Sequence, residues 1–192
     1  MTDAELAQRI RERAYLEGDF VLRSGRRSRY YLDKYRFETD PELLRELGER
    51  IATFVGASSE RPDRLAGPEL GAVALAASAS LASGLPFLIV RNAAKGYGTD
   101  RVLEGVFEPG ERVCLVEDVV TTGGAAAKAV EELRAAGLEC RTAVCVVDRE
   151  EGGVDALARQ AVRLTPLFRA SDIVGAGKDP QTRIIAWNRG PC

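Results

Sequence analysis

From residue 64 onward, short apolar runs alternate with longer stretches whose apolar residues have helical spacing. The runs are typical of buried strands and fall at about residues 64–67, 87–91, 112–117, 142–148 and 162–168. The helical stretches lie between them, at about residues 70–83, 123–136 and 153–160. This alternation predicts an α/β fold with a mostly parallel central sheet that is flanked by helices on both faces.

The segment ahead of residue 60 has a different pattern. Residues 3–16 predict a helix, and the apolar runs at 20–22 and 30–32 predict two short strands around a polar turn. Asp40 and Pro41 stand where an N-cap residue and a first helical residue are expected. We therefore expect a helix, a hairpin and a second helix ahead of the sheet.

One uncharged segment, residues 72–90, is long enough to resemble a membrane span. Gly84 and Pro86 interrupt it, however, and its first half consists largely of Ala and Ser. A buried helix, a turn and a strand at 87–90 fit this pattern better. No membrane partner is therefore predicted.

Composition narrows the class of protein further. At 192 residues the chain has the length of one domain, and a net charge of −2 without a basic stripe argues against a nucleic-acid partner. The four cysteines form no CxxC pair and histidine is absent, which excludes a mixed Cys/His zinc site. Cys114 and Cys145 lie in apolar strand patterns and are expected in the core. Without the pattern of a secretory signal at residues 1–5, the prediction is a reduced, cytoplasmic protein.

Polar residues follow several of the predicted strands. They are Glu69, Arg91, Glu117 with Asp118, and Asp148 with Arg149. Because ligands of parallel α/β sheets bind beyond the carboxyl ends of the strands, we expect these side chains to converge on one site. Residues 92–110 form a long, polar, glycine-containing loop beside them, and such loops are usually functional or disordered.

The run from Val113 to Ala129 carries the most specific chemistry. Apolar residues lead into Glu117 and Asp118, and a turn of small residues then opens an alanine-rich helix. Backbone amides of Thr121–Ala125 at the helix N-terminus could hold a phosphate, and the two carboxylates could accept hydrogen bonds from vicinal hydroxyls. A ribose 5-phosphate presents both groups. The alternative is a strand end with solvated carboxylates and an ordinary turn.

This run resembles the motif with which type I phosphoribosyltransferases bind 5-phosphoribosyl 1-pyrophosphate (PRPP). Three more segments are similar to orotate phosphoribosyltransferases: residues 20–33 to their N-terminal segment, residues 91–99 with Glu104 and Gly105 to their mobile catalytic loop, and residues 146–153 to their orotate-contacting strand end. The resemblance covers about residues 5–174. It implies the type I phosphoribosyltransferase fold with a small N-terminal hood, and the transfer of ribose 5-phosphate from PRPP to orotate. The products would be orotidine 5′-monophosphate and pyrophosphate, in UMP biosynthesis.

The resemblance also implies how the chain is organised. A single domain would cover residues 1–192, with the first helix and the hood at about 1–40, the PRPP-binding core at about 60–170 and a tail without an assigned role at 175–192. A homodimer is implied, in which the loop at residues 91–105 completes the neighbouring site. Mg²⁺ is the implied cofactor, held mainly through PRPP and without an assigned protein ligand.

The resemblance implies three sets of site residues: catalytic, PRPP-binding and orotate-binding. Catalysis would fall to Lys95, Asp118 and Arg91. PRPP would be bound by Arg91, Lys95, Tyr97, Glu117, Asp118, Val119, Val120, Thr121, Thr122, Gly123, Gly124 and Ala125. Orotate would be bound by Thr121, Arg149, Arg23, Ser24, Gly25, Tyr30 and Tyr31.

The charges of these residues suit that reaction. Cleavage of the anomeric C–O bond develops negative charge on pyrophosphate, which Arg91 and Lys95 could stabilise. Arg149 could bind the orotate carboxylate, bidentately if the geometry allows. There are simpler alternatives: a surface ion pair of Arg149 with Asp148 or Glu150, packing of Tyr30 and Tyr31 without ligand contact, and a solvated Lys95.

Three positions depart from the usual pattern of the family. Asn92 stands where a lysine often follows the loop arginine, Tyr97 stands where a histidine is often found, and Gly71 lies in a segment where many members carry a PRPP-contacting lysine. Two other functions therefore stay open. A purine phosphoribosyltransferase is disfavoured because an uncharged purine gives Arg149 no carboxylate to bind. A PRPP-sensing regulator without turnover is favoured by the missing charges and disfavoured by the lack of a basic surface.

Overall fold

The computed structural model describes residues 1–21, 25, 27–92 and 102–175, and it confirms the alternation of strands and helices. The parallel strands are β3 (Arg64–Pro68), β4 (Phe87–Val90), β6 (Arg112–Val120), β7 (Glu139–Asp148) and β8 (Arg163–Arg169). Three helices connect them along the chain: α4 (Gly71–Ser83), α5 (Gly124–Ala135) and α6 (Gly153–Ala158). The short β5 (Leu103–Glu104), which sequence analysis did not predict, adds an antiparallel edge to β4.

The order of strands in the central sheet is β5-β4-β3-β6-β7-β8. From β3 the chain proceeds to β4 on one side, whereas β6 and the strands after it lie on the other side. The order therefore reverses between β3 and β6. In open parallel sheets the carboxyl end of such a pair is the usual place for a ligand.

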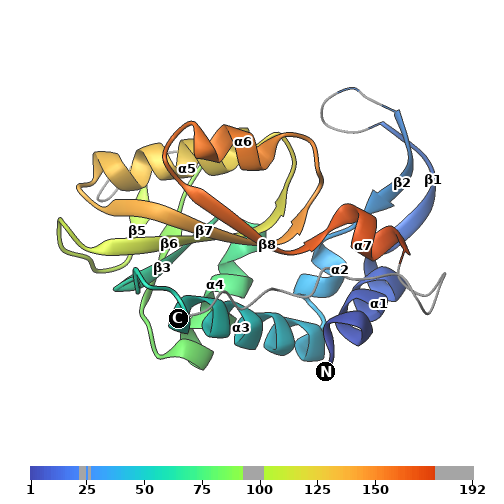
Figure 1. The fold of residues 1–192 in the computed structure, drawn as a ribbon, viewed down its shortest axis with the longest axis horizontal. Coiled ribbons are helices and arrows are strands. Elements are labelled where there is room, and N and C mark those ends of the chain that lie inside the picture. Colours follow the sequence, from blue (N-terminus) through green and yellow to red (C-terminus); the bar gives the residue numbers. More distant parts are fainter. Residues whose placement is uncertain (22–24, 26, 93–101, 176–192) are drawn as a thin grey trace.

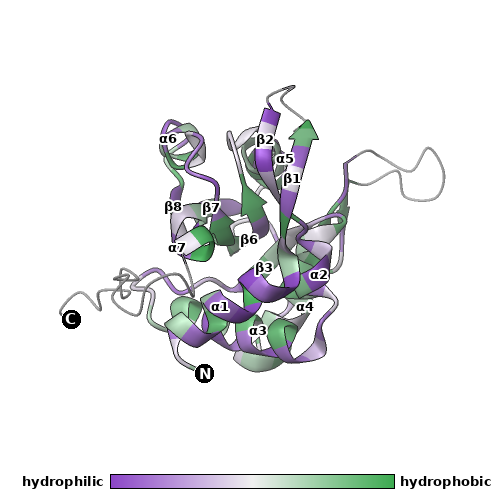
Figure 2. Ribbon diagram, turned by 90° about the vertical axis from the view of Figure 1, so that its right-hand side faces the viewer, coloured by the Kyte–Doolittle hydropathy of each residue, from purple (hydrophilic) through white to green (hydrophobic). Residues whose placement is uncertain are grey.

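Helices cover both faces of the sheet, and each face has its own core (Figure 1). Helices α5 and α6 lie on one face, and α3 (Pro41–Gly56) and α4 lie on the other. Successive residues of a strand point to opposite faces. Cys114 and Val116 accordingly join the core on the α3/α4 side, whereas Val113 and Leu115 join the core on the α5/α6 side. Figure 2 shows hydrophobic colouring along much of β6 and β7, and both colours on the outer helices α1 and α3.

The N-terminal segment forms α1 (Asp3–Ala14), the hairpin of β1 (Tyr15–Val21) and β2 (Arg27–Leu32), and the short α2 (Tyr35–Glu38). The hairpin confirms the two predicted strands, but α1 ends before residue 16 because Tyr15 already pairs with Leu32 in the hairpin. Helix α3 begins as predicted: the Asp40 side chain caps it by accepting from the amides of Glu42 and Leu43. In Figure 1 the hairpin stands beyond the carboxyl ends of the sheet strands.

The uncharged segment at residues 72–90 has the predicted structure. It contains most of α4, then Gly84 in the left-handed conformation (φ 73°) as the helix C-cap, and then β4. Within the described ranges, no helix has the length and apolarity needed to cross a membrane. Cys114 and Cys145 are buried as predicted, and burial raises the pKa of the Cys114 thiol to about 12.

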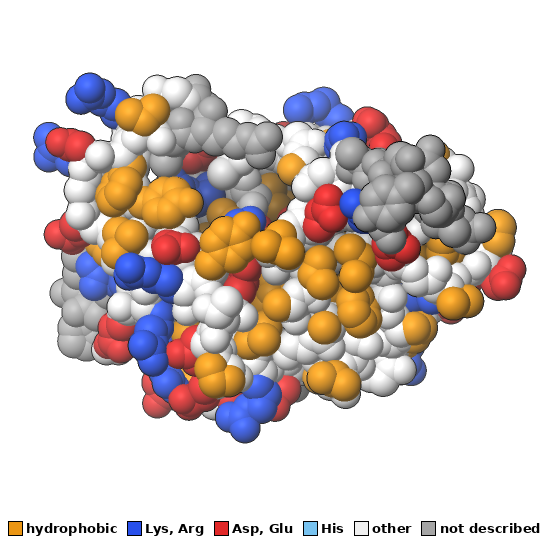
Figure 3. Space-filling model, turned by 180° about the vertical axis from the view of Figure 1, so that it is seen from behind, with side chains coloured by type: hydrophobic (Ala, Val, Ile, Leu, Met, Phe, Trp, Pro, Cys, Tyr) orange, Lys and Arg blue, Asp and Glu red, His pale blue; other side chains and the backbone are white. Residues whose placement is uncertain are grey.

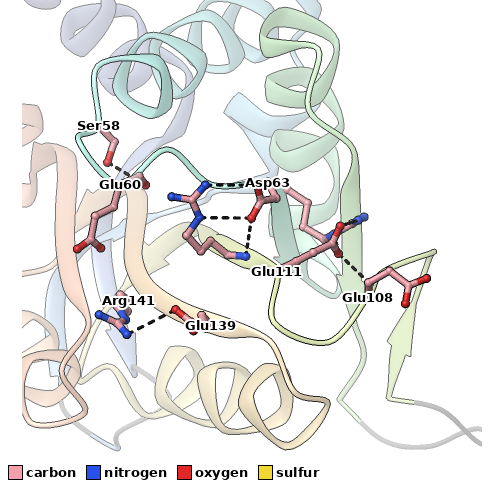
Figure 4. Close-up of polar contacts among 9 residues, drawn as sticks. Ser58, Glu60, Asp63, Glu108, Glu111, Glu139 and Arg141 are labelled. Atoms are coloured by element: carbon pink, nitrogen blue, oxygen red, sulfur yellow. Dashed lines mark hydrogen bonds and ion pairs between the residues drawn. The ribbon is translucent and has the colours of Figure 1, made fainter.

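At the amino ends of the strands, charged side chains pair with one another. Arg112 contacts Asp63, with a distance of 3.4 Å from Nε to Oδ2, and Arg141 lies 3.5 Å from Glu139 (Figure 4). Arg64 is 2.5 Å from Glu111 and is itself almost buried. The amino edge of the sheet is therefore lined by matched ion pairs.

Candidate active site

The two adjacent carboxylates lie inside β6 rather than beyond its end. The prediction that this strand stops at residue 117 is wrong, because β6 pairs with β7 as far as Val120, which lies opposite Asp148. Side chains of Glu117 and Asp118 are buried, with exposed fractions of only 7% and 4%. They are therefore not the solvated strand end that the simpler interpretation required.

Asp118 points to the α3/α4 side of the sheet, as its alternation with Cys114 and Val116 requires. Its Oδ2 lies 2.5 Å from the Nζ of Lys34, the N-cap residue of α2, and its Oδ1 accepts from the amide of Val119 at 2.5 Å. Gly71, at the start of α4, packs against this pair. A Cβ there would collide with Asp118 Oδ2 and lie 2.9 Å from Lys34 Nζ. The glycine at position 71 thus makes room for an ion pair.

Glu38, the last residue of α2, joins this group as a second buried acid. Its side chain is 3% exposed, and its Oε1 has no hydrogen-bond partner. Burial, followed by the nearby Asp118 carboxylate, raises the pKa of Glu38 to about 8. Burial and then Asp118 likewise raise the pKa of Glu117 to about 8. Burial lowers the pKa of Lys34, but attraction to Asp118 and their hydrogen bond outweigh this, so its pKa is raised.

Stability should fall as the pH rises from about 4.5 to about 8, because the unfolded chain loses the protons of Glu38 and Glu117 while the folded chain keeps them. Their contribution to stability is complete below the lower value and is lost above the higher one. Glu38→Gln removes one of the two groups, so the free energy of unfolding of this variant should fall less over this range than that of the wild type, with a difference of up to about 5 kcal/mol. Urea titrations at several pH values measure this, with the exposed Glu49→Gln as the control. Parallel curves for wild type and Glu38→Gln would contradict it.

The loop after β6 leads into the uncapped N-terminus of α5 (Gly124–Ala135). Thr121 and Thr122 are exposed, and Gly123 takes the left-handed conformation (φ 82°) as the N-cap of α5, where no side chain caps the helix. A Cβ at Gly123 would lie only 3.1 Å from the Cα of Gly153. The lack of a side chain at Gly123 therefore allows α6 to pack closely beside the loop. Amides at the beginning of an uncapped helix suit an anion such as phosphate.

Arg91 follows β4 and lies between two carboxylates. Its Nε is 3.7 Å from Glu69 and its Nη1 is 3.6 Å from Glu104. Glu69 also accepts from the amide of Asn92 at 2.8 Å. Glu69, which follows β3, and Arg91, which follows β4, are thus brought together, as predicted from their positions at strand ends.

Arg149 reaches from the end of β7 to the N-terminal hairpin. Its guanidinium lies 5.0 Å from the centre of the Tyr30 ring, Tyr30 stacks on Tyr15 at 5.4 Å, and Arg11 lies 4.8 Å over Tyr15. The Arg149 side chain is 7% exposed, and its ion pair is with Glu151 at 3.5 Å. It is therefore not engaged in the surface pair with Asp148 or Glu150 that the simpler alternative proposed.

The structure describes only some of the remaining predicted site residues. Tyr31 contacts Phe20, with ring centres 5.5 Å apart, and is partly exposed. Gly25 is exposed in the left-handed conformation (φ 79°). Arg23, Ser24, Lys95 and Tyr97 lie outside the described residues, as do most of the 91–105 loop and the tail beyond residue 175.

Two site residues, Lys34 and Glu38, were missed in the sequence. Their spacing of four residues is that of a helical pair, but α2 has only four residues and no strong apolar pattern. Nothing in the sequence indicated that Asp118, eighty-four positions later, would lie against Lys34. Their place depends on how the hood packs on the sheet.

The reversal of strand order, the buried acid pair and the uncapped loop define the class of this protein. Residues 36–163, about two thirds of the chain, match the family described as phosphoribosyl transferase domain. The fold is that of the type I phosphoribosyltransferases, as the sequence predicted.

Comparison with individual proteins identifies the family within this class. The orotate phosphoribosyltransferase of Methanocella arvoryzae is 48% identical over 174 residues, which cover 90% of this chain and 98% of that protein. A crystal structure of the Aeropyrum pernix orotate phosphoribosyltransferase has a TM-score of 0.74 at 36% identity and covers 88% of this chain and 96% of its own. The Mycobacterium tuberculosis enzyme in complex with PRPP has a TM-score of 0.75 at 29% identity and covers 90% and 98%. The chain belongs to the orotate phosphoribosyltransferase family.

Proposed function

We propose that this protein transfers ribose 5-phosphate from PRPP to orotate, giving orotidine 5′-monophosphate and pyrophosphate. The observation that carries this proposal is the pairing of two neighbouring strand ends. Strand β6 carries buried carboxylates near its end and leads into a loop suited to a sugar phosphate, and β7 is followed by Arg149, which is stacked on the hairpin. The relatives that match about nine tenths of this chain are named orotate phosphoribosyltransferase.

For PRPP, the backbone of residues 121–125 would bind the 5-phosphate, and Asp118 and Glu117 would accept hydrogen bonds from the ribose hydroxyls. A carboxylate has about four lone-pair sites, and Lys34 and Val119 use two of those on Asp118. Glu117 Oε1 is buried without a hydrogen-bond partner, so a donor is the group that would satisfy it.

For orotate, Arg149 is the residue that would bind the carboxylate. Its Nε is buried without a hydrogen-bond partner, so the guanidinium has capacity for an acceptor. Tyr30 holds the guanidinium plane in place from the hairpin side. Tyr31, Gly25, Arg23 and Ser24 would complete this pocket from the hood, and Thr121 would contact the ring from the other side.

The chemical step requires stabilisation of the charge that develops on pyrophosphate. Arg91 and Lys95 are the cations that we assign to it, with Tyr97 as a hydrogen-bond donor. Arg91 would exchange its contacts with Glu69 and Glu104 for the leaving group. A loop over residues 91–105 would exclude the water that otherwise hydrolyses the activated sugar.

Mg²⁺ fits this site as an ion that enters with PRPP. The described residues hold no group of three or more Asp, Glu, Cys or His side chains arranged for a metal, and a Glu117 with a raised pKa is a weak ligand. Oxygen atoms of PRPP itself would supply most of the coordination. When bound, Mg²⁺ would neutralise part of the pyrophosphate charge.

A homodimer is also part of the proposal, with residues 91–105 reaching the neighbouring site. Figure 3 shows hydrophobic side chains gathered across the middle of one face, with charged side chains toward its borders. The described residues include large apolar side chains that are well exposed, such as Leu70, Leu81 and Val106. Apolar surface of this kind is typical of an interface between protein chains.

The loss of orotate absorbance with PRPP and Mg²⁺ tests the reaction directly. We expect turnover of orotate and none of adenine, hypoxanthine or uracil, because only orotate has a carboxylate for Arg149. Turnover of a purine with no loss of orotate would favour the purine alternative. Binding of PRPP without turnover of any base would favour a regulator.

A further inference from the structure

The acid pair of the ribose subsite is contacted from the hood by two side chains that no sequence motif indicated. Lys34 is the N-cap residue of α2 and Glu38 is its last residue; Lys34 donates to Asp118 on β6, and the buried Glu38 lies near enough for the Asp118 charge to raise its pKa. Four ionisable side chains thus meet in one buried place: Lys34, Glu38, Glu117 and Asp118. Among the described side chains, Lys34 is the cation recorded in an ion pair with this group.

We propose that Lys34 and Glu38 are positioning residues for the ribose subsite, holding the Asp118 carboxylate from the hood side so that its remaining lone pairs are available to the ribose hydroxyls of PRPP. The proposal rests on the proposed function only in taking PRPP as the ligand. Lys34 donates to Oδ2 at 2.5 Å, and the amide of the adjacent Val119 contacts Oδ1. The carboxylate is therefore held at both oxygens before any substrate binds.

Glu38 completes this arrangement as the partner that carries a proton near neutral pH. A protonated carboxyl can donate to Asp118, whereas an ionised one would repel it. The charged groups that act on Glu38 are Asp118 and Glu117 from β6, and Lys34 and Asp33 from its own segment. Helix α4 packs against the same place and has no Asp, Glu, Lys or Arg. Ionisation of Glu38 at alkaline pH would therefore weaken the hold on Asp118.

Gly71 offers an independent way to disturb the same pair. A Cβ at this position would meet Asp118 Oδ2 and Lys34 Nζ, and the backbone there has no positive φ that would make alanine strained. Gly71→Ala should therefore separate Lys34 from Asp118 without removing either charge. Agreement between Gly71→Ala and a Lys34 variant would assign the effect to the pair rather than to one lost cation.

The experiment measures kcat and both KM values, together with calorimetric binding of PRPP in the presence of Mg²⁺ and the absence of orotate. Lys34→Met and Gly71→Ala should each weaken PRPP binding and raise its KM about tenfold, while the orotate KM changes less than about twofold. Glu38→Ala should raise the PRPP KM several-fold. Glu38→Gln should recover most of that loss, because its amide can still donate to Asp118. The matched control is Arg141→Met, which breaks an exposed ion pair at the opposite edge of the sheet.

A pH profile separates positioning from a purely structural role. Between pH 7 and pH 9 the PRPP affinity of the wild type should fall more than that of Glu38→Gln, because only the wild type ionises at this position. PRPP affinities within twofold of wild type for both Lys34→Met and Gly71→Ala would overturn the proposal. So would equal losses of PRPP and orotate binding. If Lys34→Met does not fold, Gly71→Ala and the Glu38→Gln profile decide.

The outcomes for the reaction and for the positioning residues are distinct. A wild type that binds PRPP but does not consume orotate would overturn the proposed reaction, and the calorimetric comparison would still support the positioning role if the variants bind PRPP more weakly. A wild type that consumes orotate, with variants that bind PRPP as it does, would overturn the positioning role alone.

Discussion

Replacing Lys95 by alanine should lower kcat by roughly 10²–10³-fold while the KM for orotate changes little. The charge that Lys95 is proposed to meet grows on pyrophosphate only as the anomeric bond breaks, so its loss raises the barrier more than it weakens substrate binding. The effect should be large in this chain because Asn92 and Tyr97 stand where the resemblance to the family implies a lysine and a histidine. Fewer other cations remain to compensate.

Steady-state kinetics with both substrates varied measures this prediction. Arg163→Ala, at the exposed amino end of β8 and away from the 91–105 loop, is the control for loss of a surface cation. A kcat for Lys95→Ala within about threefold of wild type would remove Lys95 from the chemical step and support the simpler interpretation of a solvated loop lysine. A further variant, Tyr97→His, should raise kcat if the missing titratable group limits the rate.

Arg149→Ala should raise the KM for orotate by roughly 10–100-fold and leave the KM for PRPP nearly unchanged. The guanidinium is already ordered by Tyr30 and Glu151 before orotate binds, so little side-chain entropy is lost on binding. Truncation removes both a charge-assisted contact and the stack on the hairpin. Arg149→Lys should recover only part of the affinity, because an ammonium has neither the planar fork nor the stacking surface of a guanidinium.

The matched control for Arg149 is Arg159→Ala, an exposed arginine just after α6. Equilibrium binding of orotate to the complex with pyrophosphate provides a second measurement that does not depend on turnover. An orotate KM for Arg149→Ala equal to that of wild type would mean that Arg149 serves only to join β7 to the hairpin.

Much of the fold could be predicted because its signals are local. Alternating apolar runs, the Asp40–Pro41 helix start and the break at Gly84 each depend on a few adjacent residues, and the structure confirms all three. The errors also have local causes. Strand β6 continues past residue 117 because β7 is long enough to pair with it, and α1 stops at Ala14 because Tyr15 enters the hairpin.

The site was only partly predictable, for a physical reason. The acids and the loop of β6 form one contiguous segment, so their roles could be inferred from their order. Lys34 and Glu38 act across a contact between segments far apart in the chain. The partners of Arg91 depend on β5, whose two residues have no clear strand pattern. Pairings of this kind arise from the packing of the hood and the sheet edge, which single residues do not reveal.

The N-terminal helix has a consequence for anyone who prepares this protein. Leu6 and Ile10 of α1 are fully buried in the same core as Leu47 of α3 and Val116 of β6, and Phe37 of α2 lies among them. Removal of the first fourteen residues would therefore open the main core and not merely shorten a surface arm. Affinity tags placed ahead of Met1 need a spacer, because the amino group of Met1 lies 3.8 Å from Glu46. A truncated protein that begins at Tyr15, the start of the hairpin, should be insoluble.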